Sequence, residues 1–318
     1  MQRILLSGIV VILLGALAWF FPLKKDSFKK KALNVQVSIK PIHSLTSFIS
    51  QGVFNPSLLM AGHESAHTQS LTPQQLHALK TSDLVIWIGP SYESLWQKPL
   101  AQLPKEQVVT LLESQGLILY PYREQDDKGS YHHHPNHHHH DSCAVDGHIW
   151  LDPENAKVLA QRICKILTEM DPAHGAVYQK NLTVLLTRLD QLKQKLDLQF
   201  GPVKNKTYMI YHDGLQYFDR RFGFKMQASL VQEPDLPPQA GHLLALKRFL
   251  LSVPPNERPV CIFSEPAFME KISENLAKEF HLFHQKIDYI GQNIPAGPEA
   301  YFLMMDQLAE GFMKGLSS

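Results

Sequence analysis

Short apolar runs alternate with helical patterns from Leu33 to the middle of the chain. The runs are short and bounded by polar or turn-forming residues, and most of them precede a stretch whose apolar residues recur every three or four positions. Four such runs are LNVQVSIKP, SLLM, DLVIWIG and QVVTLL. Strands that alternate with helices predict a parallel sheet with helices on its faces.

A long amphipathic helix is predicted over residues 174–200, and at 1.5 Å per residue it is roughly 40 Å long. Its apolar positions recur at intervals of three and four, with polar residues between them: Tyr178, Leu182, Leu185, Leu189, Leu192 and Leu196. A helix before it is predicted to begin at Pro153, because proline fits the first helical turn, and to end near Met170.

The alternation of strands and helices begins again after the long helix, with strands predicted at TYMIY, PVCIF and LFHQKIDYI. We therefore predict an α/β protein of two lobes, each with a parallel sheet flanked by helices, and a ligand site in the cleft between them. The N-terminal lobe is predicted at residues 32–172, a rigid linking helix at 173–200 and the C-terminal lobe at 201–318.

The first 31 residues predict export. MQR gives a short positive start, and ILLSGIVVILLGALAWFFPL is an apolar run of 20 residues that is followed by several lysines. The sequence ALA at 16–18 resembles a signal-peptide cleavage site, although the run is also long enough to serve as an uncleaved membrane anchor. The signal peptide is favoured over the anchor, because more lysines follow the run than precede it.

Composition restricts the remaining possibilities. The chain has 44% hydrophobic and 19% charged residues and a formal net charge of +1, and its lysines are scattered, which does not favour nucleic-acid binding. Three cysteines make no disulfide framework. Cys164 and Cys261 are predicted to be small core residues, and Cys143 lies in a histidine-rich segment.

That segment, residues 124–146, is predicted to be a mobile loop that binds metal weakly. It contains HHHPNHHHH at 132–140, and the segments around this run are hydrophilic and lack apolar periodicity. Imidazoles are adaptable metal ligands, but nothing in the loop fixes their geometry. The loop is predicted to be an auxiliary to a better ordered site, through His132, His133, His134, His137, His138, His139 and His140.

Four metal-capable side chains occupy positions near the carboxyl ends of predicted strands, where open α/β sheets bind their ligands. His212 follows TYMIY directly and Asp288 ends the strand LFHQKI, while His67 and His148 lie in loops of the N-terminal lobe. These residues are too far apart in the chain for a finger-type motif, so the fold must assemble the site. Three imidazoles and one carboxylate favour Zn²⁺ over manganese or iron.

Other polar residues near these positions leave alternatives open. His63 and Glu64 are possible ligands beside His67, and Glu265 is interpreted as an acceptor that orients a ligand histidine. Asp213 could orient a neighbour or cap the following helix. Three further histidines are interpreted as surface or structural residues: His43, His77 and His284.

Several motifs in one order resemble the zinc-binding periplasmic proteins of bacterial ABC importers, the ZnuA type, in a family with manganese-binding relatives. The motifs are SIKPIHSL, HTQSLTPQQ, SDLVIWIGPSYE, the His-rich loop, DGHIWLDPENA, YHDGLQYF, FSEPAF and IDYIGQNI. The resemblance implies zinc held between two lobes and delivered to a membrane permease driven by a separate ATPase. The family's ligand positions fall on His67, His148, His212 and Asp288, and the resemblance implies a periplasmic monomer.

The chain departs from this family at several points. Ala66 and Thr68 flank the first histidine ligand, where relatives commonly have proline and an acidic or histidine residue, and the disulfide that some relatives form from the position of Cys261 has no partner here. Two alternatives remain at this point. One is an exported zinc hydrolase with Glu64 or Glu265 as general base, and the other is an adhesin or metal-buffering protein.

Overall fold

The computed structural model describes residues 32–60, 69–123, 145–231, 238–266 and 270–317. These residues belong to one compact unit, Ala32–Ser318. Among them, no helix combines the length and the apolar character that crossing a membrane requires. The predicted leader at 1–31 and the histidine-rich run at 132–140 lie outside the described residues.

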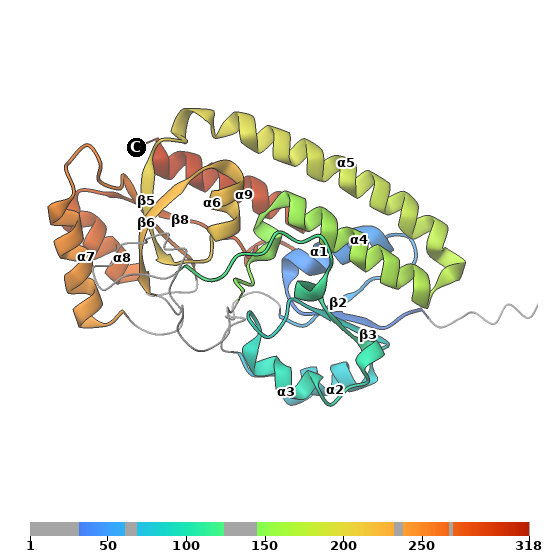
Figure 1. The fold of residues 1–318 in the computed structure, drawn as a ribbon. Helices are drawn as coiled ribbons and strands as arrows, with labels where there is room; N and C mark the ends of the chain where they lie inside the picture. Colours follow the sequence, from blue (N-terminus) through green and yellow to red (C-terminus); the bar gives the residue numbers. More distant parts are fainter. Residues whose placement is uncertain (1–31, 61–68, 124–144, 232–237, 267–269, 318) are drawn as a thin grey trace, which may run out of the picture. The chain divides into compact units, whose positions relative to one another are not determined.

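Two parallel four-stranded sheets form the framework (Figure 1). The first has the order β2-β1-β3-β4 and the second has the order β6-β5-β7-β8. The strands of the first sheet are β1 (Val35–Val37), β2 (Ser57–Leu58), β3 (Leu84–Trp87) and β4 (Val108–Thr110). Those of the second are β5 (Thr207–His212), β6 (Lys225–Val231), β7 (Cys261–Ser264) and β8 (Phe283–Lys286).

Helices flank both sheets. Those that accompany the first sheet are α1 (Lys40–Ser50), α2 (Pro73–Thr81), α3 (Gln97–Leu100) and α4 (Pro153–Met170). Those that accompany the second sheet are α6 (Gln216–Phe222), α7 (Ala240–Ser252), α8 (Glu270–Phe280) and α9 (Ala300–Leu316). The predicted fold class, an α/β fold with two parallel sheets that are flanked by helices and joined by one long helix, is confirmed.

The long helix, α5 (Gly175–Gln199), has 25 residues and packs against α1, α4 and α9 (Figure 1). All six apolar positions that define its predicted face are buried, from Tyr178 to Leu196. Helix α4 begins at Pro153, as the sequence predicted, and Asp152 caps it by accepting the main-chain N–H of Glu154 at 2.9 Å.

The second sheet is buried on both faces, which explains the continuous apolar run in β5. Tyr208 and Ile210 belong to the large core that extends through both sheets, whereas Met209 and Tyr211 belong to a smaller core under α7 and α8. Because side chains alternate along a strand, His212 lies on the same side as Tyr208 and Ile210. Strand β6, in which Met226, Ala228 and Leu230 alternate with polar residues, was not predicted from the sequence.

Candidate metal centre

His212 is the last residue of β5, and its side chain is buried. The strand order of this sheet is β6-β5-β7-β8, so the chain passes from β5 to β6 on one side and then crosses to β7 on the other side of β5. The gap between β5 and β7 is therefore the topological switch point of the sheet. The prediction that His212 lies at a strand end is therefore confirmed by the structure. Its position is the one at which open α/β sheets bind ligands.

His148 reaches the same region from the N-terminal half of the chain. It follows the isolated bridge between Pro121 and Val145, and it precedes a short 3₁₀ turn at Ile149–Leu151. Its side chain is fully buried, with 0% relative exposure. The Nδ1 atom of His148 lies 2.7 Å from Oδ1 of Asp146, which also accepts the main-chain N–H of His148 at 2.9 Å.

Asp146 is held as an ionised acceptor. Burial raises the pKa of its carboxyl, but the interaction with His148 and the hydrogen bonds from His148 and Gln216 outweigh burial and leave the pKa below its usual value. An ionised carboxylate only accepts hydrogen bonds, so Nδ1 of His148 must carry the proton. When this imidazole is neutral, its Nε2 atom then bears the lone pair that a metal ion needs.

The two imidazoles lie side by side. Their ring centroids are 5.4 Å apart, and the planes are inclined by 53°. Gly214 lies against His148 and Tyr289, because a Cβ atom at this position would be 3.1 Å from Nε2 of His148 and 2.3 Å from the hydroxyl of Tyr289. The absence of a side chain at Gly214 therefore keeps open the space beside Nε2 of His148 and the hydroxyl of Tyr289.

Tyr289 and Glu265 complete the surroundings of His212. The hydroxyl of Tyr289 is 3.1 Å from Nδ1 of His212, and Oε1 of Glu265 is 3.8 Å from the same nitrogen. Glu265 directly follows β7, the neighbour of β5 in the sheet, which explains why it approaches His212. The interpretation of Glu265 as an acceptor near a ligand histidine agrees with this position.

The other two predicted ligands are Asp288 and His67. Asp288 accepts the main-chain N–H groups of Ile290 at 3.1 Å and Gly291 at 2.7 Å through Oδ1. His67 lies outside the described residues, as do the histidines of the loop. Within the described ranges, no group of three or more His, Cys, Asp and Glu side chains is arranged to hold a metal ion. The membership of His67 and Asp288 in the ligand set stays a prediction.

A buried ion cluster lies beside His212. The guanidinium of Arg123 is 3.0 Å from Asp213 and 2.8 Å from Asp219, and Asp219 also accepts the hydroxyl of Tyr208. Burial raises the pKa of Asp213 to about 6, although Arg123 opposes this shift. In comparable clusters, losing one partner of a buried pair costs about 3–5 kcal/mol. Because Arg123 pairs with Asp213, the residue directly after His212, it fixes the start of the loop that follows His212.

Helix α6 connects the two halves of the site. The amide nitrogen of Gln216 donates to the carbonyl of Pro121 at 2.9 Å, and the hydroxyl of Tyr217 donates to the carbonyl of Asp146 at 2.8 Å. Arg221 binds the carboxylate of Asp152 with two contacts of 2.6 and 2.7 Å. These bonds place the segment that carries His148 against the segment that follows His212.

The remaining histidines and cysteines have other surroundings. Nε2 of His43 is 3.0 Å from the carbonyl of Pro56, Nε2 of His284 is 2.9 Å from Oγ of Ser264, and His77 is exposed on α2. Cys164 and Cys261 are buried and free, as predicted for core residues. Cys143 lies outside the described residues.

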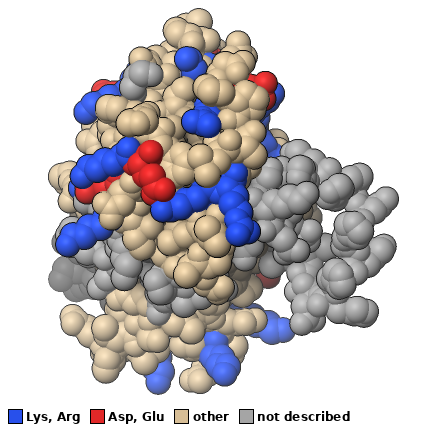
Figure 2. All heavy atoms as spheres, turned by 90° about the vertical axis from the view of Figure 1, so that its left-hand side faces the viewer, with Lys and Arg blue, Asp and Glu red and all other residues tan. Residues whose placement is uncertain are grey.

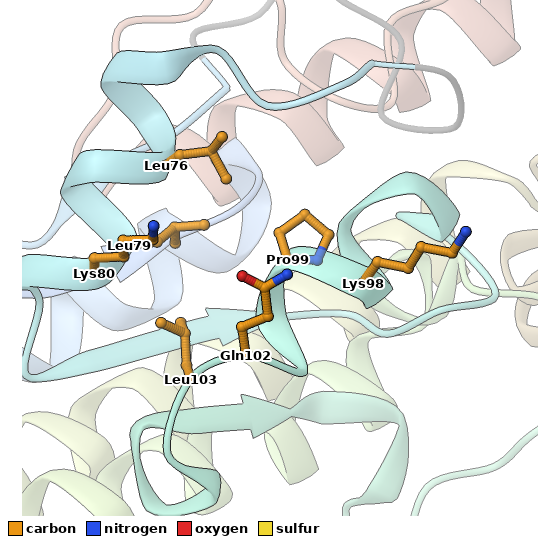
Figure 3. A pocket seen from close by; sticks show the side chains of 7 residues that line it. All are labelled: Leu76, Leu79, Lys80, Lys98, Pro99, Gln102 and Leu103. Carbon is orange, nitrogen blue, oxygen red and sulfur yellow. The ribbon is translucent and has the colours of Figure 1, made fainter.

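A separate hollow between α2 and α3 has a volume of about 280 Å³ (Figure 3). It is lined by Leu76, Leu79, Lys80, Lys98, Pro99, Gln102 and Leu103. None of these side chains is a carboxylate, imidazole or thiol, so this hollow does not suit a metal ion.

Charged side chains on the face shown in Figure 2 are mixed in sign. Basic and acidic groups lie next to one another there, and Lys247 of α7 forms an ion pair of 2.6 Å with Glu279 of α8.

Sequence reasoning missed three residues of the site, Asp146, Gly214 and Tyr289. Asp146 stands two positions before His148, and a carboxylate so close to a candidate ligand is a usable signal for a histidine partner. Tyr289 follows the predicted ligand Asp288, but no local pattern indicates that its hydroxyl reaches His212. Gly214 becomes informative only when the atoms around it are known.

A family model described as "ZnuA: Zinc-uptake complex component A periplasmic" matches residues 35–315. The high-affinity zinc uptake system protein ZnuA of Brucella suis biovar 1 (strain 1330) is 34% identical over 309 residues, which cover 89% of this chain and 91% of that protein.

Among solved structures, a mutant of the laminin-binding adhesin Lmb from Streptococcus agalactiae has a TM-score of 0.73 at 21% identity and covers 89% of this chain and 99% of its own. A ZnuA deletion mutant with zinc bound has a TM-score of 0.72 at 24% identity and covers 90% and 99%. At these identities the two structures show the fold.

Proposed function

Because this chain belongs to the ZnuA family of periplasmic zinc-uptake components, we propose that it captures Zn²⁺ with His148 and His212 and delivers the ion to the permease of an ABC importer. The permease is expected in the cytoplasmic membrane with a separate ATPase. The predicted leader at 1–31 exports the chain to the periplasm, and cleavage decides whether it is released or stays tethered to the inner membrane.

One observation carries the proposal. Two buried imidazoles from distant parts of the chain lie with their ring centroids 5.4 Å apart, and a carboxylate holds the Nδ1 atom of one of them. Carboxylates commonly hold metal-ligating histidines in this way, because they fix the tautomer and the orientation of the ring. A core histidine with a structural role does not need a second imidazole next to its ring.

His67 and Asp288 are proposed to complete the ligand set. Asp288 immediately precedes Tyr289, whose hydroxyl contacts His212, and it also lies near Lys40. Burial lowers the pKa of Lys40, and the charge of Asp288 opposes this effect. Three neutral imidazoles and one carboxylate suit the borderline softness of zinc. The two lobes at 32–172 and 201–318, joined by the helix at 173–200, would each supply two ligands.

A transport role needs no open coordination position, whereas a zinc hydrolase does. The segment 63–67 reads HESAH and has the HExxH spacing of zinc peptidases, in which the motif lies on a helix. This segment lies outside the described residues. Helix α2 does not include it, because Thr72 caps α2 in an extended conformation and the helix begins at Pro73. The family match supports transport over the hydrolase.

The histidine run at 132–140 is proposed to increase the local supply of zinc by weak, exchangeable binding. We expect that deleting residues 131–140 removes weak zinc sites and leaves one tight site, because the polar sequence around the run has no apolar periodicity that would predict a fixed ligand geometry. Competition against a chelator measures the tight site, and equilibrium dialysis counts the weak ones. In the full chain, the weak sites should empty first as the pH falls through about 6.5.

A matched control replaces the seven histidines by glutamine and keeps the length of the loop. It should behave like the deletion if the imidazoles act as weak ligands. Loss of the tight site in both variants would show that the histidine run, and not the buried pair, is the working site.

A further inference from the structure

The two ligand histidines are held by different partners. Nδ1 of His148 contacts Asp146 directly, whereas Nδ1 of His212 faces the hydroxyl of Tyr289 at 3.1 Å. Glu265 lies 3.8 Å from the same nitrogen, which is too long for a direct hydrogen bond. The tyrosine hydroxyl therefore stands where a carboxylate would otherwise orient the ring.

Tyr289 also interacts with Glu265. Its hydroxyl is buried and forms a hydrogen bond to the carboxylate of Glu265. A tyrosine hydroxyl has a single proton. When this proton is donated to Glu265, the hydroxyl oxygen can only accept from His212, and Nδ1 of His212 must then carry a proton.

We propose that Tyr289 is a positioning residue that relays the carboxylate of Glu265 to His212 and keeps this imidazole in the Nδ1–H tautomer. The chain of hydrogen bonds runs from Nδ1–H of His212 to the Tyr289 oxygen, and from the Tyr289 hydroxyl to Glu265. Nε2 of His212 then carries the lone pair, as Nε2 of His148 does. This inference rests on the proposed zinc-binding function.

The main chain fixes Tyr289 in this position. Its carbonyl accepts Nε1–H of Trp150 at 3.0 Å, and the ring lies edge-on to His148 with centroids 5.7 Å apart. The hydroxyl lies close to Gly214, where any side chain would displace it. Because Trp150 follows His148 by two residues, the same contacts that place His148 also place the relay.

The test is Tyr289→Phe, which removes only the hydroxyl. We expect the tight zinc site of the full chain to weaken about ten-fold, since outer partners of metal ligands typically contribute this much or more. Competition of Zn²⁺ against a chromophoric chelator measures the change. In the metal-free protein, long-range ¹H–¹⁵N spectra of labelled histidine should show His212 leaving the Nδ1–H form, and His148 should be unchanged.

The control is Tyr178→Phe, which removes the hydroxyl of a buried tyrosine on α5 that donates to the carboxylate of Asp171 at 3.0 Å. It should leave zinc affinity and both tautomers unchanged. Glu265→Gln should weaken the site in the same direction as Tyr289→Phe, and the double variant should lose little more than one of the single variants, because both changes break one relay.

An unchanged His212 tautomer in Tyr289→Phe overturns the relay, whatever happens to the zinc affinity. An unchanged affinity together with a changed tautomer overturns its contribution to binding. Failure of the proposed function has a different signature: His212→Ala would bind Zn²⁺ as tightly as the unaltered chain in the same assay.

Discussion

His212→Ala should weaken the tight zinc site of this protein about a hundred-fold. Structural zinc sites contribute about 10–16 kcal/mol with four ligands, so one ligand accounts for roughly 3 kcal/mol, or about a hundred-fold in affinity. Competitive titration of the purified chain with Zn²⁺, and with Mn²⁺ in parallel, measures this loss. Weak sites in the histidine run should survive the substitution.

His77→Ala is the matched control. His77 is exposed on α2, and its removal should change neither the tight site nor the thermal stability. If tight zinc binding were unchanged in His212→Ala but lost when the histidine run is removed, the run would be the working site. The proposal that His148 and His212 hold the ion would then be wrong.

Gly214→Ala should damage the same site without removing a ligand. A Cβ atom at position 214 would lie 2.3 Å from the hydroxyl and 2.7 Å from Cζ of Tyr289, so the ring or the main chain must move. Overpacking of this kind typically costs about 1–3 kcal/mol of folding free energy. Zinc affinity should fall by about ten-fold or more, because displacing Tyr289 also moves His212 and narrows the space beside His148.

Chemical unfolding and zinc competition of Gly214→Ala measure these two effects. Gly201→Ala is the control, because a Cβ atom there meets nothing within 4 Å. If Gly214→Ala had the same stability and the same zinc affinity as Gly201→Ala, the space that Gly214 leaves beside His148 and Tyr289 would not be needed for zinc binding.

Much of the fold could be predicted because local rules decide it. Pro153 begins α4, and the spacing of apolar residues from Tyr178 to Leu196 defines α5, since both depend on contacts within one helix. Strand β6 was missed because its alternation of Met226, Ala228 and Leu230 includes a small residue and lies next to a proline-rich segment. A weak period-two pattern competes poorly with strong turn signals.

The site could be predicted only in part, for a related reason. His212 follows a strong strand pattern, so the rule for ligands at strand ends selected it. The roles of Asp146 and Tyr289 depend on which atoms meet across distant segments, and no local pattern contains that information. Tyr289 is 77 residues from its partner His212 in the chain.

Contacts of α6 and Arg123 hold together the segments that carry His148 and His212. Gln216 and Tyr217 bind the segment that precedes His148, while Arg123 binds the carboxylates of Asp213 and Asp219. These contacts are buried or partly buried. The relative position of His148 and His212 is therefore fixed largely by protein contacts, which lowers the cost of ordering the site on binding.

The most direct test of this account is the position of the ion itself. Crystals of the full chain grown with one equivalent of Zn²⁺ should give their strongest anomalous peak at the zinc edge within about 2.0–2.1 Å of the Nε2 atoms of both His148 and His212. A strongest peak beyond bonding distance from both imidazoles would contradict the claim that these two histidines hold the ion.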